Sequence, residues 1–191
     1  MMGDVSGKGT SAAFNMSQMK GVFHSLVLDH PQPVAFIRKA NLALSKCLER
    51  NHFITAIYML VNTNEKSIRY SRAGHCPILY YRGTTEHADY LASEGLGLGI
   101  LRNDGYDRYV HLNELHWSSG DILVLFTDGI IEAKNEQQEE FGYMRLKEAL
   151  ALHAGKSAQE IQESIKQDVY RFIGKQQYMD DDYTLLVLKF N

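Results

Sequence analysis

Acidic residues stand at three separate points of the chain where chemistry could take place. Asp128 follows the almost continuously apolar stretch 121–126, and the run 180–182 precedes the apolar stretch 183–190. Asp4 lies in the glycine-rich opening of the chain. Carboxylates that gather in space repel one another, and hard divalent cations with oxygen ligands, magnesium or manganese, remove that repulsion. The three positions together predict a divalent-cation site.

Each acidic position also has an ordinary structural explanation when it is taken alone. Asp4 fits a helix N-cap or an ordinary loop residue, Asp128 followed by Gly129 fits a tight turn, and the run 180–182 fits a solvated loop. The combination of the three, and not any one of them, favours the cation site.

The opening loop also has some features of a phosphate-binding loop. Such a loop needs a glycine, four spacer residues and then Gly-Lys-Ser/Thr. Only three residues separate Gly3 from Gly7, Gly9 stands where the magnesium-binding hydroxyl belongs, and Asp4 would repel the phosphates. The spacing argues against a nucleotide cradle. Nucleotide hydrolysis through this loop is kept as a competing hypothesis, which predicts ATP binding that is independent of the other aspartates.

Apolar periodicity predicts the elements that must position these carboxylates. Helical spacing indicates a pair of helices at each end of a strand-rich middle, and β-branched and aromatic runs indicate the strands. This order predicts an α+β protein with antiparallel sheet, and not a doubly wound parallel sheet. The expected helices are 11–28, 33–50, 143–154 and 157–173, and the expected strands are 53–61, 67–73, 77–82, 108–115, 121–128 and 183–190.

Size and composition are those of an ordinary globular chain. Its 191 residues suffice for one sizeable core, and the net charge of −3 does not favour nucleic acid or an anionic membrane. No apolar run approaches the roughly 20 residues that a membrane span needs, and the start lacks a signal-peptide pattern. Cys47 and Cys76, the only cysteines, predict reduced thiols and a cytoplasmic location.

Motifs spread over residues 3–190 resemble the metal-dependent PPM-type serine/threonine phosphatases, in their bacterial SpoIIE/RsbU-like branch. The resemblance implies one PPM-type phosphatase domain over residues 1–191, with two antiparallel β-sheets packed as a sandwich and flanked by helical pairs. In the order of the family, the motifs are GDVSGKGTSAA, RYSRAGHCPILYYR, GLGLGI, GDILVLFTDGIIEAKN, EEFGYMRL and DDDYTLLVL.

The resemblance also implies roles for particular residues. Asp4 matches the aspartate that bridges two Mn²⁺ or Mg²⁺ ions, and the backbone carbonyl of Val5 would bind one of them. Asp128 and Asp181 match the other catalytic and metal-binding carboxylates. The implied reaction is attack on phosphoserine or phosphothreonine by a metal-activated water, which requires no protein nucleophile.

Three further motif residues have weaker implications. Ser6 stands where eukaryotic relatives carry a histidine thought to act as general acid, so the source of the leaving-group proton is unassigned. Lys8 is expected to be a solvated lysine, with a contact to the substrate phosphate as the alternative. His75 is expected to stabilise a turn.

Relatives of this family carry strands before the opening loop, with a further aspartate for the second ion. We therefore expect an N-terminally incomplete domain with a weakened second metal site, little activity by itself, and an uncovered sheet edge that favours a homodimer. The implied substrate is a phosphorylated STAS-type anti-sigma-factor antagonist, and an upstream sensor or receiver domain is expected. No contact with nucleic acid or membrane is expected. The alternative is a catalytically impaired module that binds a signalling partner.

Overall fold

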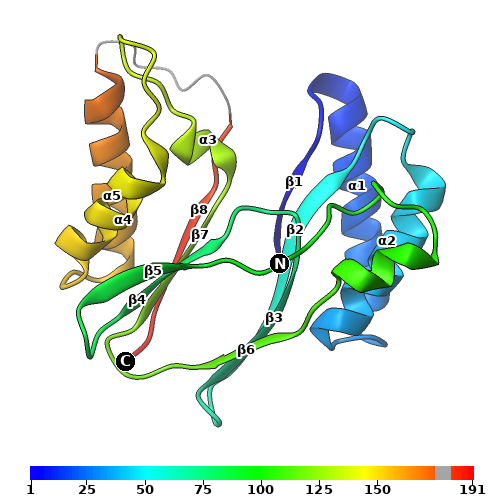
Figure 1. Cartoon of the computed structure of the whole chain (residues 1–191), viewed down its shortest axis with the longest axis horizontal. Helices are drawn as coiled ribbons and strands as arrows, with labels where there is room; N and C mark the ends of the chain where they lie inside the picture. The colour runs from blue at the N-terminus through cyan, green and yellow to red at the C-terminus, as the bar shows by residue number, and fades with distance from the viewer. Residues whose placement is uncertain (175–181) are drawn as a thin grey trace. The chain divides into compact units, whose positions relative to one another are not determined.

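A computed structural model describes residues 1–174 and 182–191 of the chain (Figure 1). The chain divides into two compact units, each with one four-stranded sheet whose strands all pair antiparallel. The first unit comprises Met1–His75 and Ser93–His116, and the second comprises Cys76–Ala92 and Trp117–Asn191.

In the first unit, two helices pack against a sheet with the strand order β1-β2-β3-β6 (Figure 1). Helix α2 buries Phe36, Ala40 and Leu44, because residues four positions apart share one helix face. The ring of Phe36 stacks on Tyr58 of the sheet with 4.1 Å between ring centroids. The elements are β1 (Met2–Val5), α1 (Gly9–Leu26), α2 (Pro33–Cys47), β2 (Ile54–Asn62), β3 (Ser67–Ala73), a 3₁₀ helix (Asp104–Tyr109) and β6 (Asn113–His116).

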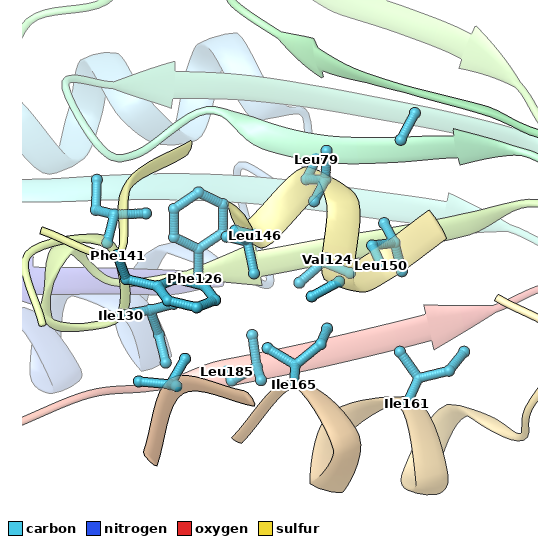
Figure 2. Packing of buried hydrophobic residues seen from close by; sticks show 14 of the residues in the cluster. Leu79, Val124, Phe126, Ile130, Phe141, Leu146, Leu150, Ile161, Ile165 and Leu185 are labelled. Atoms are coloured by element: carbon cyan, nitrogen blue, oxygen red, sulfur yellow. The ribbon is translucent and has the colours of Figure 1, made fainter. Parts of the chain in front are cut away.

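In the second unit, the sheet order is β5-β4-β7-β8, so the continuously apolar β7 is an inner strand, as its sequence predicts. Figure 2 shows Val124 and Phe126 of this sheet packed with Leu146 and Ile165 of the two long helices. Ser157 and Glu160 form a capping box that starts the last helix. The elements are β4 (Ile78–Arg82), β5 (His87–Leu91), β7 (Ile122–Phe126), α3 (Asp128–Ile131), α4 (Gly142–His153), α5 (Ala158–Ile173) and β8 (Leu185–Lys189).

The predicted α+β class with antiparallel sheets is confirmed, and each long predicted helix and strand has a counterpart. Three local predictions are wrong. The stretch 108–115 is not one strand, because the 3₁₀ helix extends to Tyr109 and β6 starts at Asn113. Asp128 and Gly129 open the short helix α3 and do not form an isolated turn. The strands β1 and β5 were not expected. Cys47 and Cys76 are thiols, as predicted.

Within the described ranges, no helix combines the length and apolar character required to cross a membrane.

Candidate active site

Asp4 is half-buried on β1, where strand pairing fixes its backbone. Its partner across the ladder is Thr55 of β2. The backbone N–H of Ser6 donates to the carbonyl of Phe53 at 3.0 Å, and the N–H of Phe53 donates to the Ser6 hydroxyl oxygen at 2.8 Å. These two reciprocal bonds fasten the residues after Asp4 to the start of β2. The Ser6 hydroxyl therefore has a structural role in this loop.

The loop that follows Asp4 reverses direction at two glycines before α1 begins. Gly7 and Gly9 have φ values of +93° and +74°, a region that side chains with a Cβ rarely adopt. The N-cap of α1 is Lys8, whose side chain makes no capping hydrogen bond. Asp4 lies four residues earlier on a strand, so the N-cap explanation of this carboxylate is wrong.

Asp128 is half-buried in the second unit, directly after the inner strand β7. The residue before it is tied to the segment that leads into β8: the N–H of Thr127 donates to the Thr184 carbonyl at 3.1 Å, and the N–H of Thr184 donates to Thr127 Oγ1 at 2.8 Å. A Cβ added to Gly129 would lie 2.6 Å from the carbonyl oxygen of Asp182. The first turn of helix α3 carries Asp128 and is therefore in close contact with the backbone of residues 182–184. We call this first helical turn the Asp128 turn.

Asp181, together with Asp180, lies outside the described residues, whereas Asp182 is described and exposed. Asp4 belongs to the first unit and Asp128 to the second. Among residues 1–174 and 182–191, no group of three or more His, Cys, Asp or Glu side chains is arranged to hold a metal ion. The predicted set of Asp4, Asp128 and Asp181 includes a residue outside these ranges, so it stays a prediction.

The chemistry of the predicted ligand atoms suits a hard divalent cation. Asp4 and Asp128 offer carboxylate oxygens and Val5 a backbone carbonyl oxygen, which are the ligand types of Mg²⁺ and Mn²⁺. Zinc sites in proteins are built mainly from cysteine and histidine, and the predicted set contains neither residue.

A buried histidine lies beside the Asp4 strand. His75 is 2% exposed, and its Nδ1 is hydrogen-bonded to Thr55 Oγ1 at 2.9 Å. The Arg72 guanidinium donates to the carbonyls of His75 and Ser93. His75 is thus held firmly in the segment after Gly74, and its turn-stabilising role stays a prediction. Its bond to the residue opposite Asp4 was not expected, because it depends on the pairing of strands that are far apart in sequence.

Tyr183 directly follows Asp182, and its phenol is hydrogen-bonded to that of Tyr170 on α5. Burial raises its pKa, and the neighbouring hydroxyl of Tyr170, 3.2 Å away, adds to the effect, so that the pKa reaches about 12.

Comparison with solved structures defines the class of protein first, because the chain has the fold of PP2C phosphatase domains. The SiaA-PP2C domain of Pseudomonas aeruginosa matches with a TM-score of 0.84 and 19% identity, covering 99% of this chain and 73% of that one. The PP2C phosphatase domain of SpoIIE from Bacillus subtilis, solved with a fragment of its regulatory domain, matches with a TM-score of 0.75 and 19% identity, covering 98% of this chain and 52% of that one.

The sequence then identifies the family. The family of Stage II sporulation protein E (SpoIIE) matches residues 1–191. The phosphoserine phosphatase RsbU of Bacillus subtilis (strain 168) is 31% identical over 189 residues, which are 97% of this chain and 53% of RsbU. The phosphoserine phosphatase RsbP of the same organism is 25% identical over 134 residues, covering 68% of this chain and 32% of RsbP. The chain belongs to the SpoIIE family and spans about half the length of RsbU.

Proposed function

We propose that this chain is the phosphatase domain of a metal-dependent protein serine/threonine phosphatase. One observation carries the proposal: the chain matches over its whole length a family whose relatives RsbU and RsbP are phosphoserine phosphatases. We further propose that residues 1–191 act as one such domain within a longer cytoplasmic protein.

In this proposal, Asp4, Asp128 and Asp181 hold the cation together with the backbone carbonyl of Val5. Support comes from the way the structure fixes the two described carboxylates. Asp4 is fixed on β1 by its ladder with β2, and Asp128 follows a residue bonded to Thr184, three positions after Asp181. In the sequence, Asp181 is the neighbour of Asp182, whose carbonyl oxygen approaches Gly129.

The residues of the chain supply binding and orientation, and the attacking group is water. Bound Mn²⁺ or Mg²⁺ supplies the activation of that water and offsets charge on the phosphoryl oxygens. The carboxylates would hold the cation in place, and the half-buried positions of Asp4 and Asp128 strengthen the attraction between opposite charges. The Ser6 hydroxyl accepts a hydrogen bond from the backbone of Phe53, and this bond fixes the loop. No residue is assigned to protonate the leaving group.

The finer points of substrate and partner rest on the resemblance of the sequence motifs to the family, and the homodimer rests on the expected uncovered sheet edge. We propose that the substrate is a phosphoserine or phosphothreonine on a bacterial regulatory protein, a STAS-type anti-sigma-factor antagonist. We also propose that a regulatory domain lies elsewhere in the protein that contains this chain, and that copies of the chain can associate as a homodimer.

Calorimetry with Mn²⁺ and release of phosphate from a phosphorylated STAS domain test the proposal on the same samples. We expect Asp4→Asn, Asp128→Asn and Asp181→Asn each to weaken Mn²⁺ binding and lower phosphate release by about 100-fold or more, since even residues behind the ligands matter by about 10–100-fold. Asp107→Asn is the matched control, because Asp107 is exposed on the 3₁₀ helix and pairs with Arg38.

Two other outcomes would contradict the proposal. Mn²⁺ binding without any release of phosphate, under conditions that activate RsbU-like enzymes, would favour the impaired binding module. Binding of ATP that is unchanged in Asp128→Asn would instead favour nucleotide hydrolysis through the opening loop.

A further inference from the structure

Three polar side chains, each from a different segment of the first unit, lie side by side on one face of its sheet. Asp4 and Thr55 are directly opposed in the antiparallel ladder of β1 and β2, and directly opposed residues project from the same face with Cβ atoms about 5 Å apart. On the other edge of β2, the His75 ring reaches the same threonine, with 2.9 Å between Nδ1 and Oγ1. Thr55 therefore lies between Asp4 and His75.

The backbone around His75 is fixed from several directions. Ala56 of β2 forms a bridge with Gly74, and Ile54 exchanges two backbone hydrogen bonds with Leu98 at 3.0 and 2.8 Å. Gly74 has φ of +69°, and a Cβ there would lie 2.8 Å from the backbone nitrogen of Gly97. With the Arg72 bond to its carbonyl added, His75 has little freedom to move away from Thr55.

The hydrogen-bonding capacity of a threonine explains what this arrangement can do. A hydroxyl has one hydrogen to donate and two lone pairs to accept with. When His75 carries a proton on Nδ1 and donates it to Thr55, the hydroxyl hydrogen of Thr55 is directed elsewhere. The carboxylate opposite it on β1 is a strong acceptor. Partners of this kind orient metal-binding carboxylates in many sites.

We propose that Thr55 and His75 form a positioning pair that orients the carboxylate of Asp4 for binding a divalent cation. This inference rests on the proposed function, since it assigns the pair to the same site. The pair acts through Asp4 and touches neither the ion nor the substrate. The bond to Thr55 gives His75 a functional role besides the turn-stabilising one that the sequence predicts.

The test measures Mn²⁺ affinity by calorimetry and phosphate release over a range of Mn²⁺ concentrations. Thr55→Val removes the hydroxyl and keeps the shape, and we expect it to weaken Mn²⁺ binding by about 10–100-fold. Thr55→Ser keeps the hydroxyl, so the bond to His75 can still form and the hydroxyl can still donate to Asp4. We therefore expect Mn²⁺ binding to stay within about threefold of wild type. Phosphate release lost by Thr55→Val at low Mn²⁺ should return at high Mn²⁺, which a general structural defect would not allow.

Substitutions of His75 provide a second comparison. The amide of asparagine can occupy the place of Nδ1, whereas that of glutamine occupies the place of Nε2. We therefore expect His75→Asn to bind Mn²⁺ more tightly than His75→Gln. Because His75 is buried, either variant can lose stability, so thermal melting is recorded for each. Thr55 is only half-buried. Its variants therefore test the proposal even if the His75 variants do not fold.

Ser71→Ala is the matched control, since it also removes a hydroxyl from this sheet. Ser71 is fully buried on β3, opposite Tyr58, and its Oγ has no hydrogen-bond partner in the part of the chain that the structure describes. Mn²⁺ affinity in this variant should equal that of wild type. If wild type binds Mn²⁺ and Thr55→Val binds it equally well, the positioning role is overturned while the proposed function stands. If wild type neither binds Mn²⁺ nor releases phosphate, both are overturned.

Discussion

The contact between Gly129 and the backbone of Asp182 makes Gly129→Ala the sharpest test of the turn that carries Asp128. An added Cβ would lie 2.6 Å from the Asp182 carbonyl oxygen, 3.2 Å from its carbonyl carbon and 3.3 Å from the Cβ of Tyr183. Non-bonded heavy atoms pack best at about 3.5 Å or more. The alanine methyl group can be accommodated only if the backbone of one of the two segments moves by about 0.5–1 Å.

The surrounding bonds resist this movement. Thr127 and Thr184 hold the two segments together through two hydrogen bonds on the far side of the contact, and Ile130 behind Gly129 is fully buried. Overpacking of this kind costs about 1–3 kcal/mol. For a chain of this size, that corresponds to a decrease in Tm of about 2–12 °C. A displacement near 1 Å at a reacting centre lowers rates by about 100-fold.

Thermal melting and phosphate release at saturating Mn²⁺ check these two expectations. Gly155→Ala is the control in the same unit, because no atom lies within 4 Å of a Cβ placed there. We expect its free energy of unfolding to stay within about 0.5 kcal/mol of wild type. An unchanged Tm in Gly129→Ala would show that the contact with Asp182 is not tight. A lowered Tm with full activity would show that the Asp128 turn is remote from the reaction, and the assignment of Asp128 would be wrong.

Three further predictions concern stability. Arg102 donates to three carbonyls at the end of α2 and just after it, those of Ser45, Leu48 and Glu49, and to the carbonyl of Gly99 in its own loop. Arg102→Ala should therefore lower the free energy of unfolding by about 1–3 kcal/mol in urea titrations, and a loss below about 0.5 kcal/mol would contradict the capping role. Hydrogen bonds from Ser157 lower the pKa of Glu160 below its ordinary value of 4.5; its stabilising effect is therefore present above that value and is lost as the pH falls through the lowered pKa. The Tm difference between wild type and Glu160→Gln should shrink on acidification from pH 6 to pH 3, and a constant difference would contradict this linkage. Ile165 is fully buried between α5 and the sheet. Ile165→Ala should therefore lower the free energy of unfolding by about 2–5 kcal/mol. A free energy of unfolding equal to that of wild type, measured by calorimetry, would contradict this packing.

Long elements were predictable because their periodicity depends on local sequence. Helix α2 places Phe36, Ala40 and Leu44 on one face, and the pattern is visible without any partner. Strand β7 is apolar at every position, which is typical of an inner strand. Short elements were not predictable in this way. The strand β5 has five residues with one buried position, and its place is set by its pairing with β4 and by the turn at 83–86.

The candidate site, like the fold, was predictable only in part. Motif order identified the family and named Asp4 and Asp128 as candidates, and their grouping with Asp181 stays a prediction. The environment of each described carboxylate could not be predicted. Thr55 is 51 positions from Asp4 in the sequence, and no local pattern indicates that the two are opposed.

The sequence by itself determined which long segments are helical or extended, which of their faces are apolar and which family the chain belongs to, because periodicity and motifs are properties of neighbouring residues. Only the tertiary structure decided that Thr55 faces Asp4, that His75 bonds to Thr55, and that residues 127 and 184 are tied together. The physical reason is the register of the sheets. A shift by one residue would turn every side chain of a strand to the other face, and burial of the whole sheet selects the register.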